Sequence, residues 1–127
     1  MEIIERNNKW NYIKPDGTYI SDVWFDFAND FEDEIARVNL NNKFNYIDKS
    51  GKLVSDVWFD FVFDFNNGFA YVILNNKWNY IDKKGKLLSD TWFDDANYFH
   101  DDFAEIKTKN DLYELDKRGN LYFSVRN

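Results

Sequence analysis

The chain has 127 residues and a net charge of −7, from 16 Lys and Arg against 23 Asp and Glu, so its surface would repel nucleic acid and anionic membranes. It contains no cysteine, which excludes disulfides, thiolate metal ligands and cysteine nucleophiles. The length suits a single repeat domain over residues 1–127, and the absence of a signal-like or membrane-spanning apolar run predicts a cytoplasmic protein.

An internal repeat with a period of 34 residues organises the sequence. Residues 10–43 and 44–77 are identical at 19 of 34 positions, and residues 44–77 and 78–111 at 17. Spacing this regular predicts a tandem array in which each repeat is one structural unit. The repeats begin at the equivalent positions Trp10, Phe44, Trp78 and Leu112. We place the structural units at about 1–34, 35–68, 69–102 and 103–127.

Each repeat contains two strand-like segments joined by a tight turn. Ala36, Val38 and Leu40 alternate with polar residues, which is typical of a strand with one buried face. The Asn-Asn pair at 41–42 follows, and asparagine tolerates the left-handed backbone that a two-residue hairpin turn needs. The second strand then includes the aromatic residue at which the repeat begins, as in residues 44–48.

A glycine turn ends the second strand of every repeat. Four of the five glycines occupy this position, where we expect a positive φ that closes a three- or four-residue hairpin. The four are Gly17, Gly51, Gly85 and Gly119. A third strand is predicted after each turn, at residues 19–20, 53–54, 87–88 and 121–123.

The connectors between repeats are predicted to form short helices. In the first connector Trp24, Phe25 and Ala28 would lie on one helical face, with acidic residues four apart on the opposite face. A bent strand is the alternative, because aromatic residues also favour extended structure. The acidic residues of the three connectors are Asp22, Asp26 and Asp30, then Asp56, Asp60 and Asp64, then Asp90 and Asp94.

These elements predict an all-β, mainly antiparallel repeat protein. It would consist of four three-stranded meanders of period 34, joined by short helical connectors in an open solenoid-like stack. Closure of the four meanders into a small four-bladed propeller is the alternative architecture.

The repeat also resembles a known family. Residues 44–52 read aromatic, small, Tyr, Ile, Asp, Lys, x, Gly, Lys, and are followed by Phe-Asp at 59–60 and Phe-Ala-x-Val at 69–72. This combination resembles the WG (KWG) repeat family over essentially the whole chain, with Asn11, Asn45 and Asn79 where the family typically has glycine. The resemblance implies a β-rich tandem array of the kind found in bacterial and phage proteins, and it implies no shared reaction.

No set of residues points to catalysis, a cofactor or a metal. His100 is the one histidine, and beside Asp101 and Asp102 we expect a solvated loop residue; an enzyme would need a site in this loop. Connector carboxylates four apart on a helix could converge on a hard cation such as Ca²⁺. They lack the spacing of an EF-hand loop, however, which favours a solvated helix face.

We therefore predict a non-enzymatic module for protein–protein interaction through an acidic, aromatic-rich surface, of the kind a phage or bacterium would encode to bind or inhibit another protein. The surface would comprise the connector aspartates and Tyr71, which lies in the outward register between Ala70 and Val72. Its partner would have a basic surface, and unpaired end strands would support a homodimer. The alternative is a carbohydrate-binding module that uses the repeat aromatics.

Overall fold

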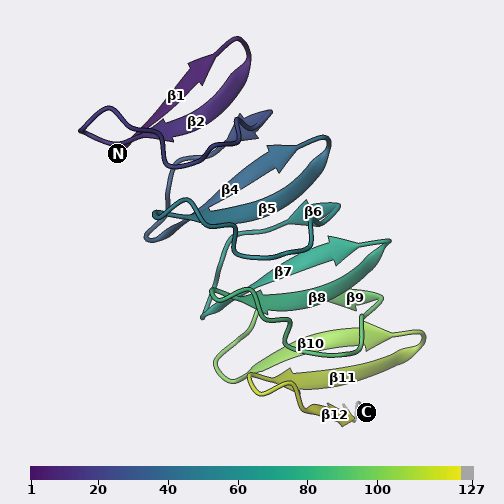
Figure 1. Ribbon diagram of the computed structural model, residues 1–127. Coiled ribbons are helices and arrows are strands. Elements are labelled where there is room, and N and C mark those ends of the chain that lie inside the picture. The colour runs from purple at the N-terminus through teal and green to yellow at the C-terminus, as the bar shows by residue number, and fades with distance from the viewer. Residues whose placement is uncertain (124–127) are drawn as a thin grey trace. The chain divides into compact units, whose positions relative to one another are not determined.

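The computed structural model describes residues 1–123, and within these residues the regular secondary structure consists of β-strands alone (Figure 1). The strands are β1 (Glu2–Arg6), β2 (Lys9–Ile13), β3 (Phe27–Ala28), β4 (Ile35–Leu40), β5 (Lys43–Asp48), β6 (Phe61–Val62), β7 (Phe69–Leu74), β8 (Lys77–Asp82), β9 (Asp95–Ala96), β10 (Phe103–Thr108), β11 (Asp111–Asp116) and β12 (Leu121–Phe123). This part of the chain offers no helix long and apolar enough to cross a membrane.

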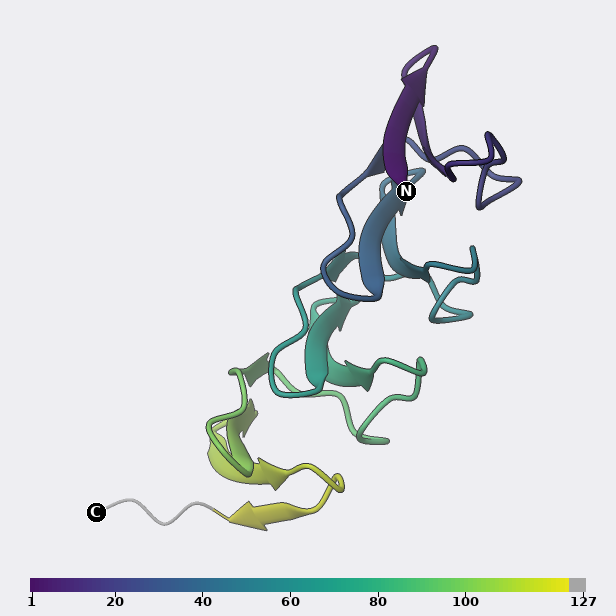
Figure 2. The ribbon, with the colours of Figure 1, turned by 90° about the vertical axis from the view of Figure 1, so that its left-hand side faces the viewer.

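The strands belong to two compact units, Met1–Phe59 and Asp60–Asn127. The first unit holds the hairpin β1-β2 and the sheet β3-β4-β5, and the second holds the sheets β6-β7-β8 and β12-β11-β10-β9 (Figures 1 and 2). Every pairing is antiparallel, and none of these sheets closes on itself within residues 1–123. The all-β, antiparallel class is therefore confirmed. The single domain and the choice between an open stack and a propeller stay predictions.

The Asn-Asn pairs form the hairpin turns, as predicted. Between β4 and β5, Asn41 and Asn42 have φ values of 53° and 64°, and Leu40 pairs with Lys43 across the turn. Positive φ at both central residues is the property of a two-residue type I′ turn, whose twist matches that of the flanking strands. Asparagine adopts this conformation at a lower cost than most residues.

The connectors are extended, so the predicted short helices are wrong. In the first connector, Phe25 exchanges two backbone hydrogen bonds with Trp10, with N···O distances of 2.7 and 2.8 Å. The next residues, Phe27–Ala28, form β3 and pair with β4. The backbone N–H groups therefore bond to strands distant in sequence rather than to carbonyls one helical turn earlier. This tertiary pairing outweighs the helical spacing of the side chains.

The third strand of each predicted meander is present only in part. Leu121–Phe123 form β12 and pair with β11. The equivalent residues of the other repeats make single bridges instead, namely Ile13 with Tyr19, Ile47 with Leu53, and Ile81 with Leu87. The short connector strands β3, β6 and β9 each add to the edge of a hairpin. The arrangement of four three-stranded meanders is thus only partly confirmed.

The core of each unit is built from the inward residues of the alternating strands. In β10, Ala104 and Ile106 are buried while Phe103 and Lys107 are exposed, which confirms the predicted period of two. Around them the second unit buries Tyr80, Phe93, Phe99 and Leu115, and the first unit buries Tyr12, Phe25, Ala28, Ala36, Val38 and Ile47.

Successive repeats of a unit meet at the glycine turns. Gly51 and Gly119 have φ values of 92° and 91°, which confirms the predicted positive φ. A Cβ atom at Gly51 would lie 1.8 Å from the carbonyl oxygen of Ile20 in the preceding repeat, and one at Gly119 would lie 2.5 Å from that of Leu88. Gly17 has the same φ but nothing within 4 Å of its Cβ position. Glycine therefore also permits close approach between repeats, which the sequence alone did not indicate.

Three equivalent asparagines, Asn11, Asn45 and Asn79, have completely buried side chains. The Nδ2 group of Asn45 donates to the Ser55 carbonyl at 2.8 Å, and its Oδ1 accepts from the Tyr46 N–H at 2.7 Å and the Ser55 N–H at 3.3 Å. Asn11 and Asn79 make the first two of these bonds in their own repeats. The side-chain amide of this asparagine thus links the second strand of the repeat to the segment that follows the glycine turn by hydrogen bonds.

Candidate functional site

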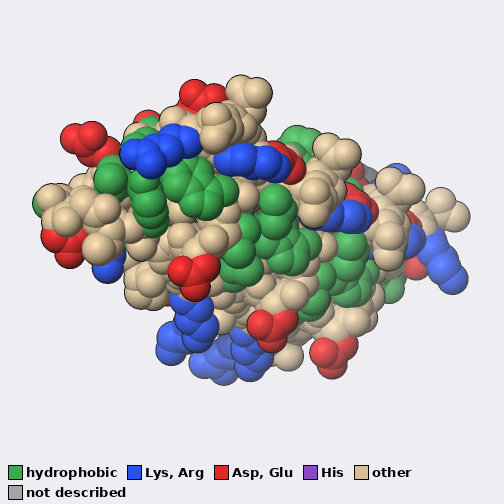
Figure 3. All heavy atoms as spheres, turned by 45° about the horizontal axis from the view of Figure 1, so that its top comes forward, with side chains coloured by type: hydrophobic (Ala, Val, Ile, Leu, Met, Phe, Trp, Pro, Cys, Tyr) green, Lys and Arg blue, Asp and Glu red, His purple; other side chains and the backbone are tan. Residues whose placement is uncertain are grey.

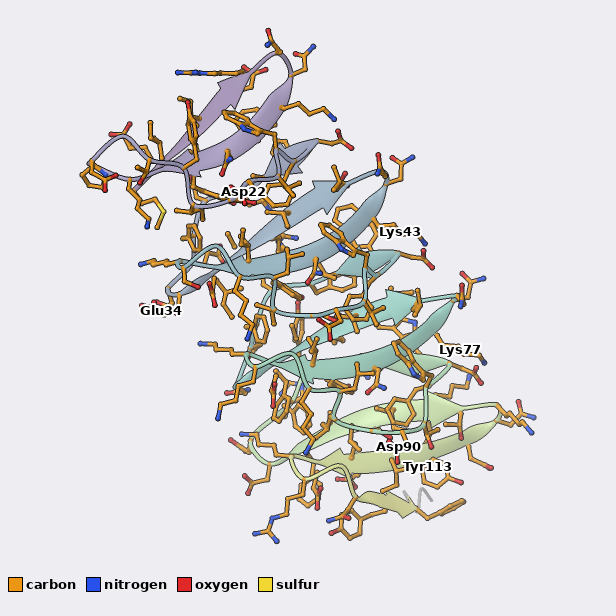
Figure 4. The ribbon with its side chains drawn as sticks, viewed as in Figure 1. Asp22, Glu34, Lys43, Lys77, Asp90 and Tyr113 are labelled. Carbon is orange, nitrogen blue, oxygen red and sulfur yellow. The ribbon has the colours of Figure 1, made fainter. Side chains whose placement is uncertain are left out.

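The acidic residues of the connectors are spread along extended backbone and do not share one face. Asp22 and Asp90 lie exposed in the loops (Figure 4). Asp56 is exposed in the equivalent loop, and Asp30 and Asp64 are exposed after the short strands. Residues 1–123 contain no group of three or more acidic or histidine side chains close enough to hold a metal ion. The solvated helix face expected for these carboxylates is absent because the connectors are extended, and the predicted place of these aspartates in a binding surface stays a prediction.

The remaining connector aspartates, Asp26, Asp60 and Asp94, bind the hairpin turns. Asp60 Oδ2 accepts from the Asn75 N–H at 2.8 Å, and Asp26 Oδ2 accepts from the Asn41 N–H at 2.7 Å. Asp94 accepts from the ammonium group of Lys77 and also from the backbone N–H of Lys109 in the next hairpin turn. The Lys77 ammonium, then that turn N–H, lower the pKa of Asp94. Asp26 has a lowered pKa for the same reasons. These three residues have a structural role in the array.

Acidification is expected to weaken the turns that Asp26 and Asp94 bind. Each carboxyl has a folded pKa below its ordinary 3.8, so the ionised form favours folding. This stabilisation is complete above the unfolded pKa and is lost as the pH falls through the lower folded pKa. Asp94→Asn should therefore lower the melting temperature at about pH 7, and the deficit should shrink at about pH 3, where wild-type Asp94 is also becoming neutral.

Melting followed by circular dichroism at both pH values measures this effect. The matched control is Asp90→Asn, which removes the same charge from an exposed connector loop and should leave the melting temperature nearly unchanged. A deficit of equal size at both pH values would show that the charge of Asp94 is irrelevant to the turn.

The second unit carries a cluster of surface aromatic side chains, which we call the aromatic cluster: Phe61, Phe63, Tyr71, Trp78 and Tyr98. Phe63 stacks on Trp78 with ring centroids 5.7 Å apart and meets the Tyr71 ring edge-on at 4.7 Å. Tyr71 in turn contacts Tyr98 at 4.5 Å. Phe61 lies at the end of this series, 5.4 Å from Phe63, and is 47 % exposed. The rings form a continuous, partly solvent-exposed surface.

The aromatic cluster occupies positions at which the repeats differ. The first repeat has Asn29 and Arg37 where the second has Phe63 and Tyr71. With its amide oxygen turned toward Arg37, Asn29 accepts hydrogen bonds from Nε at 3.2 Å and Nη2 at 3.0 Å. Similarly, Tyr98 stands where the earlier repeats have aspartate. A polar pair in one repeat has thus become an aromatic pair in the next, while the neighbouring strands are the same in both repeats.

Tyr71 is half-buried within the aromatic cluster and is less exposed than the outward register predicted. Desolvation, followed by a hydrogen bond with Tyr98 and the negative charge of Asp95, raises the pKa of Tyr71 to about 12. Tyr71 is therefore an uncharged hydroxyl at neutral pH. Its predicted place in a binding surface stays a prediction, now with identified neighbours.

A cleft of about 580 Å³ opens beside the Tyr71–Tyr98 pair in the second unit. One wall is held in place by Asn67, whose Nδ2 group donates to the Phe99 carbonyl at 2.9 Å. Its lining combines amides, aromatic rings, one imidazole and one carboxylate: Asn66, Asn67, Tyr71, Asn97, Tyr98, Phe99, His100 and Glu105.

His100 is exposed, as the sequence predicts, but it lines this cleft. The cleft itself was missed by sequence reasoning, which treated every repeat as equivalent. A signal was available in the residues that break the 34-residue pattern. Tyr71, Tyr98 and Glu105 all differ from their counterparts in the other repeats.

The hairpins of constant period and the buried residues that recur in each repeat define the chain as an all-β repeat protein. The sequence pattern of the WG containing repeat matches residues 10–44, 46–78 and 80–113. The chain belongs to this WG repeat family, which is a non-catalytic repeat family. The resemblance seen in the sequence is thereby confirmed.

Two solved structures are similar to the chain. "KlHsv2 with loop 6CD replaced by a Gly-Ser linker", which is β-propeller-like, has 8 % identity and a TM-score of 0.50, with 91 % of this chain and 45 % of that chain covered. A protein of unknown function from Bacteroides caccae has 14 % identity and a TM-score of 0.41, with 98 % and 57 % covered. The chain thus spans about half the length of either structure. No curated protein sequence matches it.

Proposed function

We propose that the chain is a non-enzymatic repeat module that binds another protein through the aromatic cluster of its second unit. The observation that carries this proposal is the contiguous, partly exposed series of rings from Phe61 to Tyr98, built where the repeats differ from one another. Aromatic side chains are enriched at protein interfaces and supply most of the binding energy there. Membership of a non-catalytic repeat family supports a binding role.

The charge of the chain supports a partner with a basic surface. The net charge is −7, from 16 Lys and Arg against 23 Asp and Glu, and on the face shown in Figure 3 both acidic and basic side chains border the hydrophobic side chains that reach the surface. A field of this sign accelerates encounters with a positively charged protein, and salt screens that effect. A phage or bacterium would use such a module as a binder or inhibitor of another protein.

Replacement of two rings of the aromatic cluster should abolish partner capture. Phe61→Asp and Phe63→Asn introduce residues that the third repeat already carries at the equivalent positions, Asp95 and Asn97, so the fold should tolerate them. The wild-type chain, immobilised and exposed to lysate of its host cell, should capture a protein that mass spectrometry identifies. The double variant should bind that purified protein at least about tenfold more weakly, because interface rings are the usual hot spots.

The matched control is Phe27→Asp in the first unit, at the position equivalent to Phe61. Phe27 is 51 % exposed, so the substitution adds the same charge and removes the same ring as Phe61→Asp alone, which is measured beside the double variant. Its affinity for the captured protein should stay within about twofold of wild type. Equal losses at Phe27 and Phe61 would refute the aromatic cluster as the contact surface.

The carbohydrate-binding alternative has its own measurement. Soluble glycans that stack on Trp78 would quench or shift the tryptophan fluorescence. A response to glycans in wild type, lost in Trp78→Phe, would replace the protein-binding proposal. No response across a broad panel would remove the alternative.

The homodimer through end strands also stays a proposal. In the second unit, β12 lies at the edge of its sheet, and Leu121, Tyr122 and Phe123 are all exposed on it. Exposed apolar edge strands pair readily with a second chain. Light scattering on the purified chain should therefore give the mass of a dimer at high concentration, and Tyr122→Lys should give the monomer mass.

A further inference from the structure

We propose that the cleft of the second unit binds the guanidinium group of an arginine side chain on the partner protein, stacked on the Tyr71–Tyr98 ring pair and paired with the Glu105 carboxylate. This inference rests on the proposed function and specifies one chemical group of the partner. It arises from the geometry and charge of the cleft.

The lining of the cleft offers partners for both the flat faces and the N–H groups of a guanidinium. The Tyr71 and Tyr98 rings lie 4.5 Å apart with 32° between their planes, so they pack face to face, and a flat cation would stack on the outer face of this pair. Guanidinium is flat and weakly hydrated, and it stacks on such rings by a cation–π interaction. Its five N–H groups can bond at the same time to the Glu105 carboxylate and to the carbonyl oxygens of amides such as Asn97.

The surroundings of the cleft are acidic. Glu105 lines it, and Glu114 stands directly opposite Glu105 across the β10–β11 pair. Asp95 contributes to the raised pKa of Tyr71, which places a second negative charge near the ring pair. Among the described residues that line the cleft, His100 has the one basic side chain. A cationic group is therefore favoured over an anionic one.

The first unit shows that rings of this chain accept cations. Arg6 holds its guanidinium carbon 5.8 Å from the centroid of the Tyr19 ring, and Lys49 holds its ammonium 6.0 Å from that of Phe31. Moreover, the first repeat has an arginine of its own, Arg37, at the position of Tyr71. Tyr71→Arg should therefore be compatible with the fold and would place a repelling charge beside the cleft.

Titration of the ¹⁵N-labelled full chain with Nα-acetyl-arginine methylamide tests the proposal. Two-dimensional NMR at about pH 8, above the ordinary titration range of histidine, should show shifts confined to the amides of Tyr71, Tyr98, Phe99 and Glu105 and their neighbours. A single side chain without the rest of its protein should bind with a Kd on the order of 1–10 mM. The citrulline analogue, which has the same shape and no charge, should bind at least about fivefold more weakly.

Three variants distinguish binding in the cleft from a general attraction of cations to an acidic protein. Glu105→Gln should weaken arginine binding at least about fivefold, and Tyr71→Arg should abolish the shifts. Glu114→Gln removes the same charge from the facing strand, outside the cleft lining, and should change the affinity less than about twofold. The dispersion of each NMR spectrum reports in the same sample whether the variant is folded.

Several results would overturn the proposal. These are an absence of shifts up to about 50 mM arginine derivative, equal binding of the citrulline analogue, or shifts of the same amides by methyl glycosides but not by arginine. The last result would assign the cleft to a saccharide. Capture of a partner without arginine binding would refute this inference alone. Arginine binding without any captured protein would leave the cleft in place and refute the protein-binding function.

Discussion

Gly51→Ala is expected to lower the free energy of unfolding by about 3–5 kcal/mol, among the largest losses that a single substitution can cause. The added Cβ would lie 1.8 Å from the carbonyl oxygen of Ile20 and 2.9 Å from its carbonyl carbon. Both atoms are backbone, so relief requires the two repeats to move apart. The substitution also forces a side chain into a φ of 92°, which L-residues disfavour by about 1–2 kcal/mol.

The chain contains its own controls for this prediction. Gly17→Ala meets the same unfavourable φ with nothing within 4 Å of the new Cβ, so it should cost only the backbone term of about 1–2 kcal/mol. Gly119→Ala, whose Cβ would lie 2.5 Å from the Leu88 oxygen, should fall between the two.

Urea denaturation gives the free energies, and hydrogen exchange shows which unit loses protection. Equal losses at Gly17 and Gly51 would mean that positive φ alone explains the glycines and that the repeats do not need close approach.

Asn45→Ala is expected to cost about 3–4 kcal/mol, the second large effect. The substitution removes one donor and one acceptor that bond to Ser55 and to the Tyr46 N–H inside the first unit, where water is excluded. Each buried backbone group left without a partner costs about 1–3 kcal/mol. Asn45→Asp should be at least as damaging, because it loses the donor to the Ser55 carbonyl and buries a charge.

Comparison among the repeats makes this prediction specific. Asn11→Ala removes the equivalent bonds to Ser21 and Tyr12 but not a counterpart of the third bond that Asn45 makes to the Ser55 N–H, so its loss should be smaller, about 2–3 kcal/mol. The half-buried Asn39 of β4 is the control, and Asn39→Ala should change stability by less than about 1 kcal/mol. Thermal and urea melts measure all three. A loss at Asn45 no larger than that at Asn39 would show that the amide bridge is dispensable.

Local chemistry allowed much of the fold to be predicted from the sequence. Asn41 and Asn42 adopt the left-handed conformation because their residue type tolerates it, and the alternation of Ala36 and Val38 places both in the core. The constant period then extended these local features to the other repeats.

The connectors were mispredicted because their side chains satisfy two patterns. Trp24, Phe25 and Ala28 have helical spacing, but the backbone of the connector is extended because its hydrogen-bond partners are distant in sequence. The Phe25 N–H group bonds to Trp10 and the Asp26 N–H group to Asn39, and nothing within the connector indicates that these partners are in reach.

The candidate site was beyond sequence reasoning for a related reason. The regular repeats identified residues that maintain the array, including Asp26, Asp60 and Asp94, which bond to the turns and whose place in a binding surface stays a prediction. The cleft depends instead on residues that differ from their counterparts in the other repeats, such as Tyr98 and Glu105, whose proximity arises from β10 and the loop before it. Only the three-dimensional arrangement shows that these exceptions lie together.

The exchange of Asn29 and Arg37 for Phe63 and Tyr71 has a consequence for protein engineering. Two neighbouring positions on adjacent segments have changed from a hydrogen-bonded pair to an edge-to-face aromatic pair, while the buried asparagine, the Asn-Asn turn and the glycine around them are unchanged. The array therefore combines structural residues that are the same in both repeats with a surface pair that can be replaced. A library randomised at residues 63, 71 and 98 should yield mostly folded chains with altered recognition, and the natural chain would be one member of that library.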